Sequence, residues 1–181
     1  MKKIHLAIMT GCLVLASTAS ANLVGNGGFE AGIFSPWTAV NSVLTTTAAN
    51  VHSGTYAAQL NAITSEITQT VPIIGGGKYA LDFWAMTDGE GALTVTLDSA
   101  FVVNIPFSGA SAYTHYSFPS ITALSVGDIT FKWSDGANRH AFVDDVNLVP
   151  VPEPSTYLAG ALLLLPFAAS TMRRLRKNRT A

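Results

Sequence analysis

Between residues 22 and 149, apolar and polar side chains alternate in short segments with a period of two. This pattern gives a β-strand one apolar face and one polar face, so it predicts antiparallel strands that each cover a core with one side. The clearest segments are residues 79–86, 92–99, 128–135 and 141–149. Further strands are expected near residues 23–29, 38–46, 55–61, 64–72, 101–107 and 113–119.

Turn sequences separate these segments, most clearly at Gly75-Gly76-Gly77 and at Asp88-Gly89-Glu90-Gly91. Helix-like apolar periods are few. About eight to ten short strands with such turns predict an all-β fold, namely a β-sandwich of the jelly-roll type. Cys12 is the only cysteine, so no disulfide can hold this body together and its stability must come from a packed core, with or without a bound metal.

Residues 1–21 have the three parts of a secretory signal peptide: two lysines, an apolar stretch and the small-residue cleavage site Ala19-Ser20-Ala21. We therefore expect a signal helix that signal peptidase removes before Asn22. A lipoprotein signal ending at Cys12 is the alternative, but the apolar stretch before Cys12 is very short. The pattern predicts that the body is exported.

Residues 155–171 form a run of 17 residues without a charge, and residues 172–181 contain five Lys or Arg side chains. As a helix the run would be about 25 Å long, just short of a typical hydrocarbon core. Pro166 lies within it, which a membrane helix tolerates. Basic residues beyond an apolar run favour the cytoplasmic side, so a single transmembrane helix is predicted with the body outside. A buried core helix followed by a solvated tail is the alternative.

The sequence Val151-Pro152-Glu153-Pro154-Ser155 stands directly before this run. Residues 150–181, with the Pro-Glu-Pro motif at 152–154, resemble the PEP-CTERM sorting signal of exported bacterial proteins. The resemblance implies processing by an exosortase, a membrane transpeptidase, in a Gram-negative bacterium that makes exopolysaccharide. It also implies an inner-membrane-anchored precursor that becomes a cell-surface or secreted protein. Proline on both sides of Glu153 would keep the motif extended and accessible to a peptidase.

The charge of the body excludes one class of partner and its motifs disfavour catalysis. Residues 22–152 carry three basic and ten acidic side chains, a net charge near −7, so nucleic-acid binding is not expected. The sequence contains no Gly-x-Ser-x-Gly elbow, His-Glu-x-x-His pair or phosphate loop. A catalytic pair of carboxylates for glycoside hydrolysis remains an alternative, because such a pair is defined by the distance between the two groups in the fold and not by their separation in the sequence. We expect no enzymatic activity.

Three further landmarks are the box Asn-Gly-Gly-Phe-Glu at residues 26–30 followed by Trp37, His52-Ser53-Gly54, and Val143-Asp144-Asp145-Val146. In this order they resemble β-sandwich carbohydrate-binding modules of the galactose-binding-like fold, over most of residues 22–149. The resemblance implies a non-catalytic domain, residues 22–149, that associates with polysaccharide, here with exopolysaccharide. The alternative is a structural matrix protein without a discrete ligand site.

A structural calcium ion is one expectation. Asp144 has the same parity as Phe142, Val146 and Leu148, so if these pack inward its carboxylate points toward the core, where an unpaired charge is costly. The resembling modules hold Ca²⁺ near the joined chain ends, which implies Glu30 and Asp144 as ligands, with carbonyls near residues 53–54 completing the oxygen set. Alternatively, Glu30 caps a turn and Asp144 lies at a wet strand end.

A sugar site is the other expectation. Trp84 shares the polar face of its segment with Asp82, and an exposed indole beside a carboxylate suits a sugar, because the ring stacks on C–H groups while hydroxyls form hydrogen bonds. Lys132, on the polar face of another segment, is expected to share this surface with Trp84 and Asp82. The alternative is that a loop or the second sheet covers Trp84. Trp37 and Trp133 are expected in the core.

Overall fold

The computed structural model describes residues 21–61, 64–98, 101–134 and 138–152, which contain ten strands in two sheets. The strands of sheet I are β1 (Thr38–Val40), β4 (Ser65–Val71), β6 (Glu90–Leu97), β7 (Phe101–Ser108) and β9 (Gly127–Ser134). The strands of sheet II are β2 (Ser42–Thr45), β3 (Ala57–Asn61), β5 (Lys78–Thr87), β8 (Thr114–Thr122) and β10 (His140–Pro150). One short 3-10 helix, η1 (Ala48–Asn50), lies between β2 and β3.

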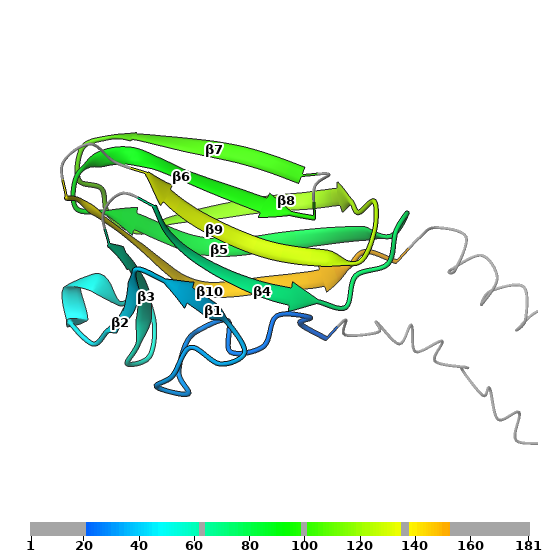
Figure 1. Ribbon diagram of the computed structural model, residues 1–181, viewed down its shortest axis with the longest axis horizontal. Coiled ribbons are helices and arrows are strands. Elements are labelled where there is room, and N and C mark those ends of the chain that lie inside the picture. Colours follow the sequence, from blue (N-terminus) through cyan, green and yellow to red (C-terminus); the bar gives the residue numbers. More distant parts are fainter. Residues whose placement is uncertain (1–20, 62–63, 99–100, 135–137, 153–181) are drawn as a thin grey trace, which may run out of the picture.

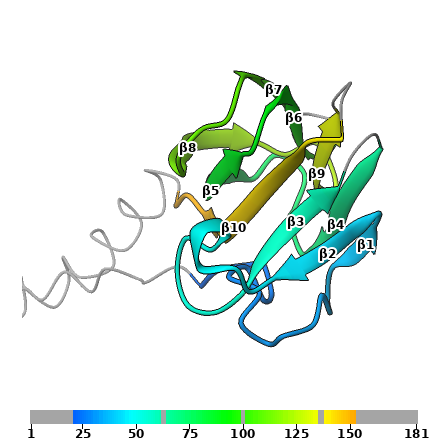
Figure 2. The ribbon, with the colours of Figure 1, turned by 90° about the vertical axis from the view of Figure 1, so that its left-hand side faces the viewer.

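The two sheets pack face to face as a β-sandwich, which Figures 1 and 2 show from two sides. Sheet I has the order β1-β4-β9-β6-β7 and sheet II the order β2-β3-β10-β5-β8. Neighbouring strands are antiparallel throughout. The predicted all-β sandwich is therefore confirmed, and the described residues contain no α-helix.

The core lies between the sheets and is filled by alternate side chains of both. On β5, Leu81, Phe83 and Ala85 are fully buried, whereas the residues between them are only half-buried. Phe83 of sheet II meets Phe131 of sheet I edge to face, with ring centroids 4.9 Å apart, an arrangement that aromatic rings favour. Trp37 and Trp133 belong to the same core, as predicted.

The strand expected near residues 23–29 is not formed, and turns occupy the segment instead. Asn26 and Phe29 have positive φ angles of 50° and 59°, which a strand does not allow. The backbone of Gly25 pairs with a side chain, because its N–H donates to Oε1 of Gln69 at 2.7 Å and its carbonyl accepts from Nε2 at 2.9 Å. Phe29 is still fully buried, so the segment contributes to the core as a folded loop.

Both ends of the described body lie at one end of the sandwich, on the right in Figure 1. Leu23 N–H donates to Leu148 O at 2.8 Å, and Val151 N–H donates to Lys78 O at 2.8 Å. No helix in the described ranges is both long and apolar enough to cross a membrane. The predicted membrane helix at 155–171 and all of the predicted signal peptide (residues 1–21) except Ala21 lie outside the described residues.

Candidate functional sites

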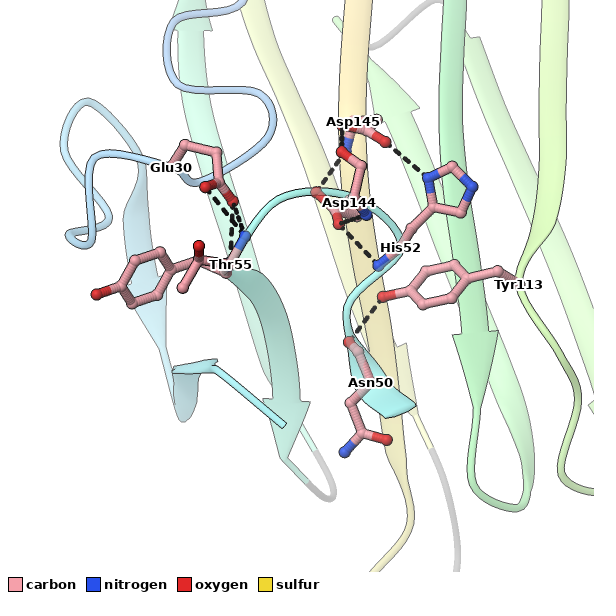
Figure 3. A network of polar contacts seen from close by, with 9 residues as sticks. Glu30, Asn50, His52, Thr55, Tyr113, Asp144 and Asp145 are labelled. Carbon is pink, nitrogen blue, oxygen red and sulfur yellow. Dashed lines mark hydrogen bonds and ion pairs between the residues drawn. The ribbon is translucent and has the colours of Figure 1, made fainter. Parts of the chain in front are cut away.

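Three carboxylates hold the loop of residues 51–56, called here the His-Ser-Gly loop (Figure 3). The first is Glu30, which follows the buried Phe29. Its two oxygens accept the Thr55 N–H at 2.9 and 3.0 Å, and Oε1 also accepts the Tyr56 N–H at 2.9 Å. The turn just before these donors needs a positive φ, which Gly54 supplies at 69°. Glu30 therefore caps the end of the loop where β3 begins.

The other two carboxylates come from β10. Asp144 is fully buried, and its Oδ2 accepts the N–H groups of His52 and Ser53 at 3.0 and 3.2 Å. Its Oδ1 accepts the N–H of Asp145 at 2.8 Å. Asp145 in turn accepts the Ser53 hydroxyl at 2.8 Å and lies 2.7 Å from His52 Nδ1. Side chains far apart in the sequence thus fix one loop.

The buried position of Asp144 perturbs its acidity. Burial raises the pKa of Asp144 to about 6, the neighbouring Asp145 charge adds to this, and the backbone N–H groups of Ser53, Asp145 and His52 offset only part of it. Burial and the same two carboxylates also raise the pKa of Tyr113, whose hydroxyl donates to Asn50 O at 2.9 Å. Among the ion pairs of the described residues, His52 pairs with Asp145 and none involves the buried Asp144.

The parity expected for Asp144 is wrong, because β10 contains a β-bulge. The register with β5 shifts between Asp144 and Asn147, and Asp145 has a φ of 50°. Asp144 lies directly opposite Trp84 and therefore on the outward face of sheet II. Val143 and Val146 enter the core instead. The carboxylate points away from the space between the sheets and is buried by the His-Ser-Gly loop.

Glu30 and Asp144, the predicted calcium ligands, are brought to one place. A Cβ added to Gly28 would lie 3.9 Å from Glu30 Cγ and 4.0 Å from Asp144 Oδ1. Their oxygen donors suit Ca²⁺ if backbone carbonyls supply the remaining ligands. No three His, Cys, Asp or Glu side chains in the described ranges are grouped to hold a metal ion. The residue chemistry fits calcium, and calcium binding stays a prediction.

Trp84 faces outward with Asp82, as its parity predicts, but its ring already has partners. The His52 imidazole stacks on it with ring centroids 3.9 Å apart and an interplanar angle of 15°. The His115 ring lies 5.0 Å away at 30°, and its Nε2 is 3.6 Å from Asp82 Oδ1. The His-Ser-Gly loop therefore covers part of the indole, and a stacking sugar would compete with His52.

Lys132 does not join Trp84 and Asp82. It lies on β9 in sheet I, opposite Glu66 and Thr94, whereas Trp84 and Asp82 lie on β5 in sheet II. The two sheets pack through their apolar faces, so their polar faces point to opposite sides of the sandwich. The expectation that Lys132 shares a surface with Trp84 and Asp82 was wrong for this reason.

The outward surface of sheet I, called here the polar face, carries rows of mainly hydrogen-bonding side chains across neighbouring strands, with one valine at the end of each of the two rows that follow. One row is Thr38, Thr68, Thr130, Thr96 and Val102, and the next is Val40, Glu66, Lys132, Thr94 and Asn104. Every outward position of these five strands is half-buried or exposed. None of the outward side chains described there is aromatic. The polar face is therefore open along its whole width.

A pocket of ≈ 290 Å³ lies at the end of the sandwich where β5 and β7 finish. Asp88, Glu90 and Arg139 give it charges of both signs. Burial raises the pKa of Asp88, but hydrogen bonds from His140, the charge of His140 and the charge of Arg139 together bring it below its ordinary value. His140 Nδ1 lies 2.6 Å from Asp88 Oδ2. Sequence reasoning missed this pocket, because it combines three separate turns.

The predicted sorting motif is described only in part. The Val151 N–H donates to the carbonyl oxygen of Lys78 and so extends the pairing of β10 with β5, and Pro152 is exposed. Glu153, Pro154 and Ser155 lie outside the described residues.

Comparisons with known proteins agree with this architecture. Residues 21–105 match the model of a family described as "Carbohydrate binding domain". The solved structure of TmCBM61 in complex with β-1,4-galactotriose is 25% identical, with a TM-score of 0.59 over 73% of this chain and 100% of that chain. A search of curated proteins finds no match.

Two further solved structures share the fold. The enzymatically active domain of tailspike protein 4 of bacteriophage CBA120 is 17% identical, with a TM-score of 0.57 over 72% of this chain and 21% of that chain. The K3 adhesin domain of Lys-gingipain from Porphyromonas gingivalis is 15% identical, with a TM-score of 0.55 over 71% and 98%.

These findings define the class of the body as a β-sandwich domain like those of carbohydrate-binding modules. Within that class, the similarity to the galactotriose-bound module extends over the whole of that module.

Proposed function

We propose that the protein is an exported, non-catalytic polysaccharide-binding protein of the cell surface or extracellular matrix, and that the polar face of sheet I receives the polysaccharide. The observation that carries the proposal is the open surface of hydroxyl, amide and charged groups that crosses all five strands. The match to a carbohydrate-binding family and the similarity to a module solved with a galactose oligomer support the ligand class.

The geometry of the polar face favours an extended glycan over a single sugar. Neighbouring strands are about 4.8 Å apart, so each row offers hydrogen-bonding side chains on four of its five strands, at intervals close to the length of one sugar unit. Thr68 and Thr130 already lie with their hydroxyl oxygens 3.0 Å apart across the strands. Without an aromatic platform, binding depends on many weak hydrogen bonds, each contributing about 1 kcal/mol. We expect weak binding that increases with chain length.

Lys132 is the most informative side chain of this surface. It is exposed in the middle strand of sheet I, and no ion pair joins it to the neighbouring Glu66 among the described residues. An ammonium group there can donate to several sugar oxygens or to an acidic sugar. In a body with a net charge near −7, it gives this face a local site for an anionic or oxygen-rich ligand.

The outward face of sheet II is the second candidate. What favours it is the exposed His115 next to Asp82 and the half-buried Trp84, which together offer aromatic and carboxylate groups. Because this face and the polar face lie on opposite sides of the sandwich, a substitution on one face tests that face alone as the glycan-binding surface.

The test is affinity electrophoresis of the full chain in the exopolysaccharide of its host, together with a glycan array. Lys132→Ala should reduce retention several-fold, whereas Lys78→Ala, which removes the same charge outside the polar face, should leave retention unchanged. Trp84→Ala should leave it unchanged as well. Loss of retention by Trp84→Ala alone would assign the site to sheet II. If the wild-type protein binds no glycan, the alternative of a structural matrix protein without a ligand site replaces this proposal.

Export and sorting form the second part of the proposal. The signal-peptide pattern and the three-part pattern of residues 150–181 support cleavage by signal peptidase and by an exosortase-type transpeptidase, from an inner-membrane precursor. Mass spectrometry of surface and medium fractions should find a body that begins at Asn22 and lacks the basic residues 172–181. A Glu153→Ala variant should accumulate as the membrane-bound precursor. Recovery of the mature protein with both ends intact contradicts the proposal.

We also propose that calcium fastens the His-Ser-Gly loop to β10. Glu30 and Asp144 would hold the ion together with loop carbonyls, and the ion would supply the positive charge that the buried carboxylate lacks.

A further inference from the structure

The end of the sandwich from which the chain leaves β10 carries an exposed apolar surface. Ile74, Leu124 and Val126 are 71%, 70% and 69% exposed, more than any other large apolar side chain in the described ranges. We call these three residues the apolar tip. Isolated exposed apolar residues are ordinary, but several gathered at one point mark an interaction surface.

Two adjacent loops build the apolar tip. Ile74 belongs to the β4–β5 loop, and Leu124 and Val126 belong to the β8–β9 loop. Gly76 N–H donates to Ala123 O at 2.7 Å, and Ala123 N–H donates to Gly77 O at 3.0 Å. A side chain at Gly75 would collide with the carbonyl of Leu124. The backbones of the two loops are therefore in contact, so the exposed side chains of Ile74, Leu124 and Val126 extend from one end of the sandwich.

Hydrogen bonds hold the tip in this arrangement. Oδ2 of Asp98 accepts the N–H groups of Leu124 and Ser125 at 3.0 and 2.7 Å, and Oδ1 accepts the Ser125 hydroxyl at 3.1 Å. In the other loop, the Ile74 N–H donates to the hydroxyl of Tyr79 at 2.7 Å. The apolar side chains thus remain exposed on an ordered backbone, although nothing in the described protein covers them.

The chain leaves the body beside this tip. Val151 is hydrogen-bonded to Lys78, which directly follows Gly77 of the β4–β5 loop. Figure 1 shows this loop and the end of β10 at the same end of the sandwich. From Val151 to Ser155, where the uncharged run of 17 residues begins, the extended chain spans at most about 14 Å. A body tied to a membrane-inserted run therefore stands against the membrane with this end.

If the run of residues 155–171 spans the bilayer as a helix, its short length would bring the body closer still. Seventeen helical residues span about 25 Å, against a hydrocarbon core of about 30 Å. A short span is accommodated by thinning of the bilayer, which draws the flanking residues toward the headgroups. The headgroup region is roughly 5–8 Å deep on each side, so the apolar tip is within reach of it.

We propose that the apolar tip docks on the lipid bilayer and holds the anchored sandwich upright. The ligand is the boundary between lipid headgroups and acyl chains, in which apolar protein surface is buried about 5–10 Å deep. The proposal rests on the membrane span proposed for residues 155–171 and is independent of glycan binding. It places the charged pocket at Asp88, at the opposite end of β5, farthest from the membrane.

The experiment uses the full chain with Cys12→Ser in nanodiscs of phosphatidylethanolamine and phosphatidylglycerol that carry a nitroxide on an acyl chain. A fluorophore is attached to a single cysteine introduced by Val126→Cys or, as the control at the far end, by Ala110→Cys. Fluorescence at residue 126 should fall by roughly half, because interfacial groups lie about 5–10 Å into the headgroup boundary. Fluorescence at residue 110 should not change. Equal quenching at both positions overturns the proposal.

If protein and not lipid covers the apolar tip, the experiment gives a different result. If residue 126 is shielded from aqueous iodide but not quenched by the lipid nitroxide, the tip is covered by protein, either the apolar run or a second copy, and lipid docking is refuted. Leu124→Asp should abolish the quenching at residue 126, whereas Val102→Asp, which changes an exposed apolar residue of sheet I, should not. A chain that fails to enter nanodiscs refutes the membrane span itself and with it the docking.

Discussion

Acidification should stabilise this fold through Asp144. Its carboxyl group has an ordinary pKa of 3.8, and burial raises the pKa to about 6 in the folded protein. Between these two values the folded state keeps a proton that the unfolded chain releases. The stability from this group is therefore fully present below about pH 3.8 and is lost as the pH rises through about 6.

The size of the effect follows from the two pKa values. The difference between 3.8 and about 6 corresponds to about 3 kcal/mol of lost stability at neutral pH. Lowering the pH from about 7.5 to about 5 recovers roughly 1.4 kcal/mol of it. For a domain of this size, such a gain raises Tm by roughly 3–6 °C.

The measurement is thermal unfolding by circular dichroism at several pH values in EDTA. Asp144→Asn lacks this titration, so the difference between its pH profile and that of the wild type isolates the residue from the histidines. Identical profiles refute the reasoning. With saturating calcium the sign should reverse, because Ca²⁺ binds the ionised carboxylate and acidification then lowers Tm. Profiles that calcium leaves unchanged contradict the calcium proposal but not the titration of Asp144.

The fastening of the His-Ser-Gly loop gives two further predictions, both measured by urea unfolding in EDTA. Glu30→Ala should cost about 1–2 kcal/mol, because two backbone N–H groups lose their acceptor, and Glu30→Gln should cost less; a wild-type midpoint for Glu30→Ala would show that the loop does not need this carboxylate. Gly54→Ala should cost about 2–3 kcal/mol, because φ is 69° and the new Cβ would meet the carboxyl of Glu30. Gly76→Ala is the control, because Gly76 also has a positive φ, 81°, but a Cβ there would have no atom within 4 Å. If both variants lose the same stability, the cost comes from the backbone conformation alone and not from contact with Glu30.

The strands could be predicted from the sequence wherever one face of the strand is buried in the core and the other is exposed to solvent. Residues 79–86 were expected, and β5 covers Lys78–Thr87; residues 128–135 were expected, and β9 covers Gly127–Ser134. In both strands the buried side chains occupy every second position, so the period-two signal is complete. The segment 23–29 has apolar residues too, but its pairing partner is Gln69, a side chain 44 residues away, which no local pattern contains.

The bulge in β10 shows where the assignment of faces from period-two alternation fails. The alternation of residues 141–149 is real on each side of Asp145, but one inserted residue reverses the parity between Val143 and Val146. The sequence does hold a signal for the irregularity. Aspartate is depleted in strand interiors and tolerates a positive φ, so the pair Asp144-Asp145 within an apolar strand favours a bulge over a regular strand.

Among the candidate sugar residues, Trp84 and Asp82 share one face as predicted, and only Lys132 lies elsewhere, for a different reason. Period two assigns Trp84 and Lys132 correctly to the polar sides of their strands, but it does not say which sheet each strand joins. That assignment depends on pairing between distant segments: β5 lies between β10 and β8, and β9 lies between β4 and β6. Two strands of similar pattern therefore present their polar faces in opposite directions.

The same long-range pairing gives the sandwich two unlike ends. The β4–β5 and β8–β9 loops come together because β5 and β8 are neighbours, and this places Ile74 beside Leu124 at the end where Val151 leaves the body. At the other end of β5, the turn at Asp88 meets Arg139. An apolar end next to an apolar run, and a charged end opposite it, is the arrangement expected of a domain displayed from a membrane. Once processing has removed the covalent tie, only three exposed apolar side chains would hold the body to the bilayer, which by themselves offer too little apolar area for stable attachment.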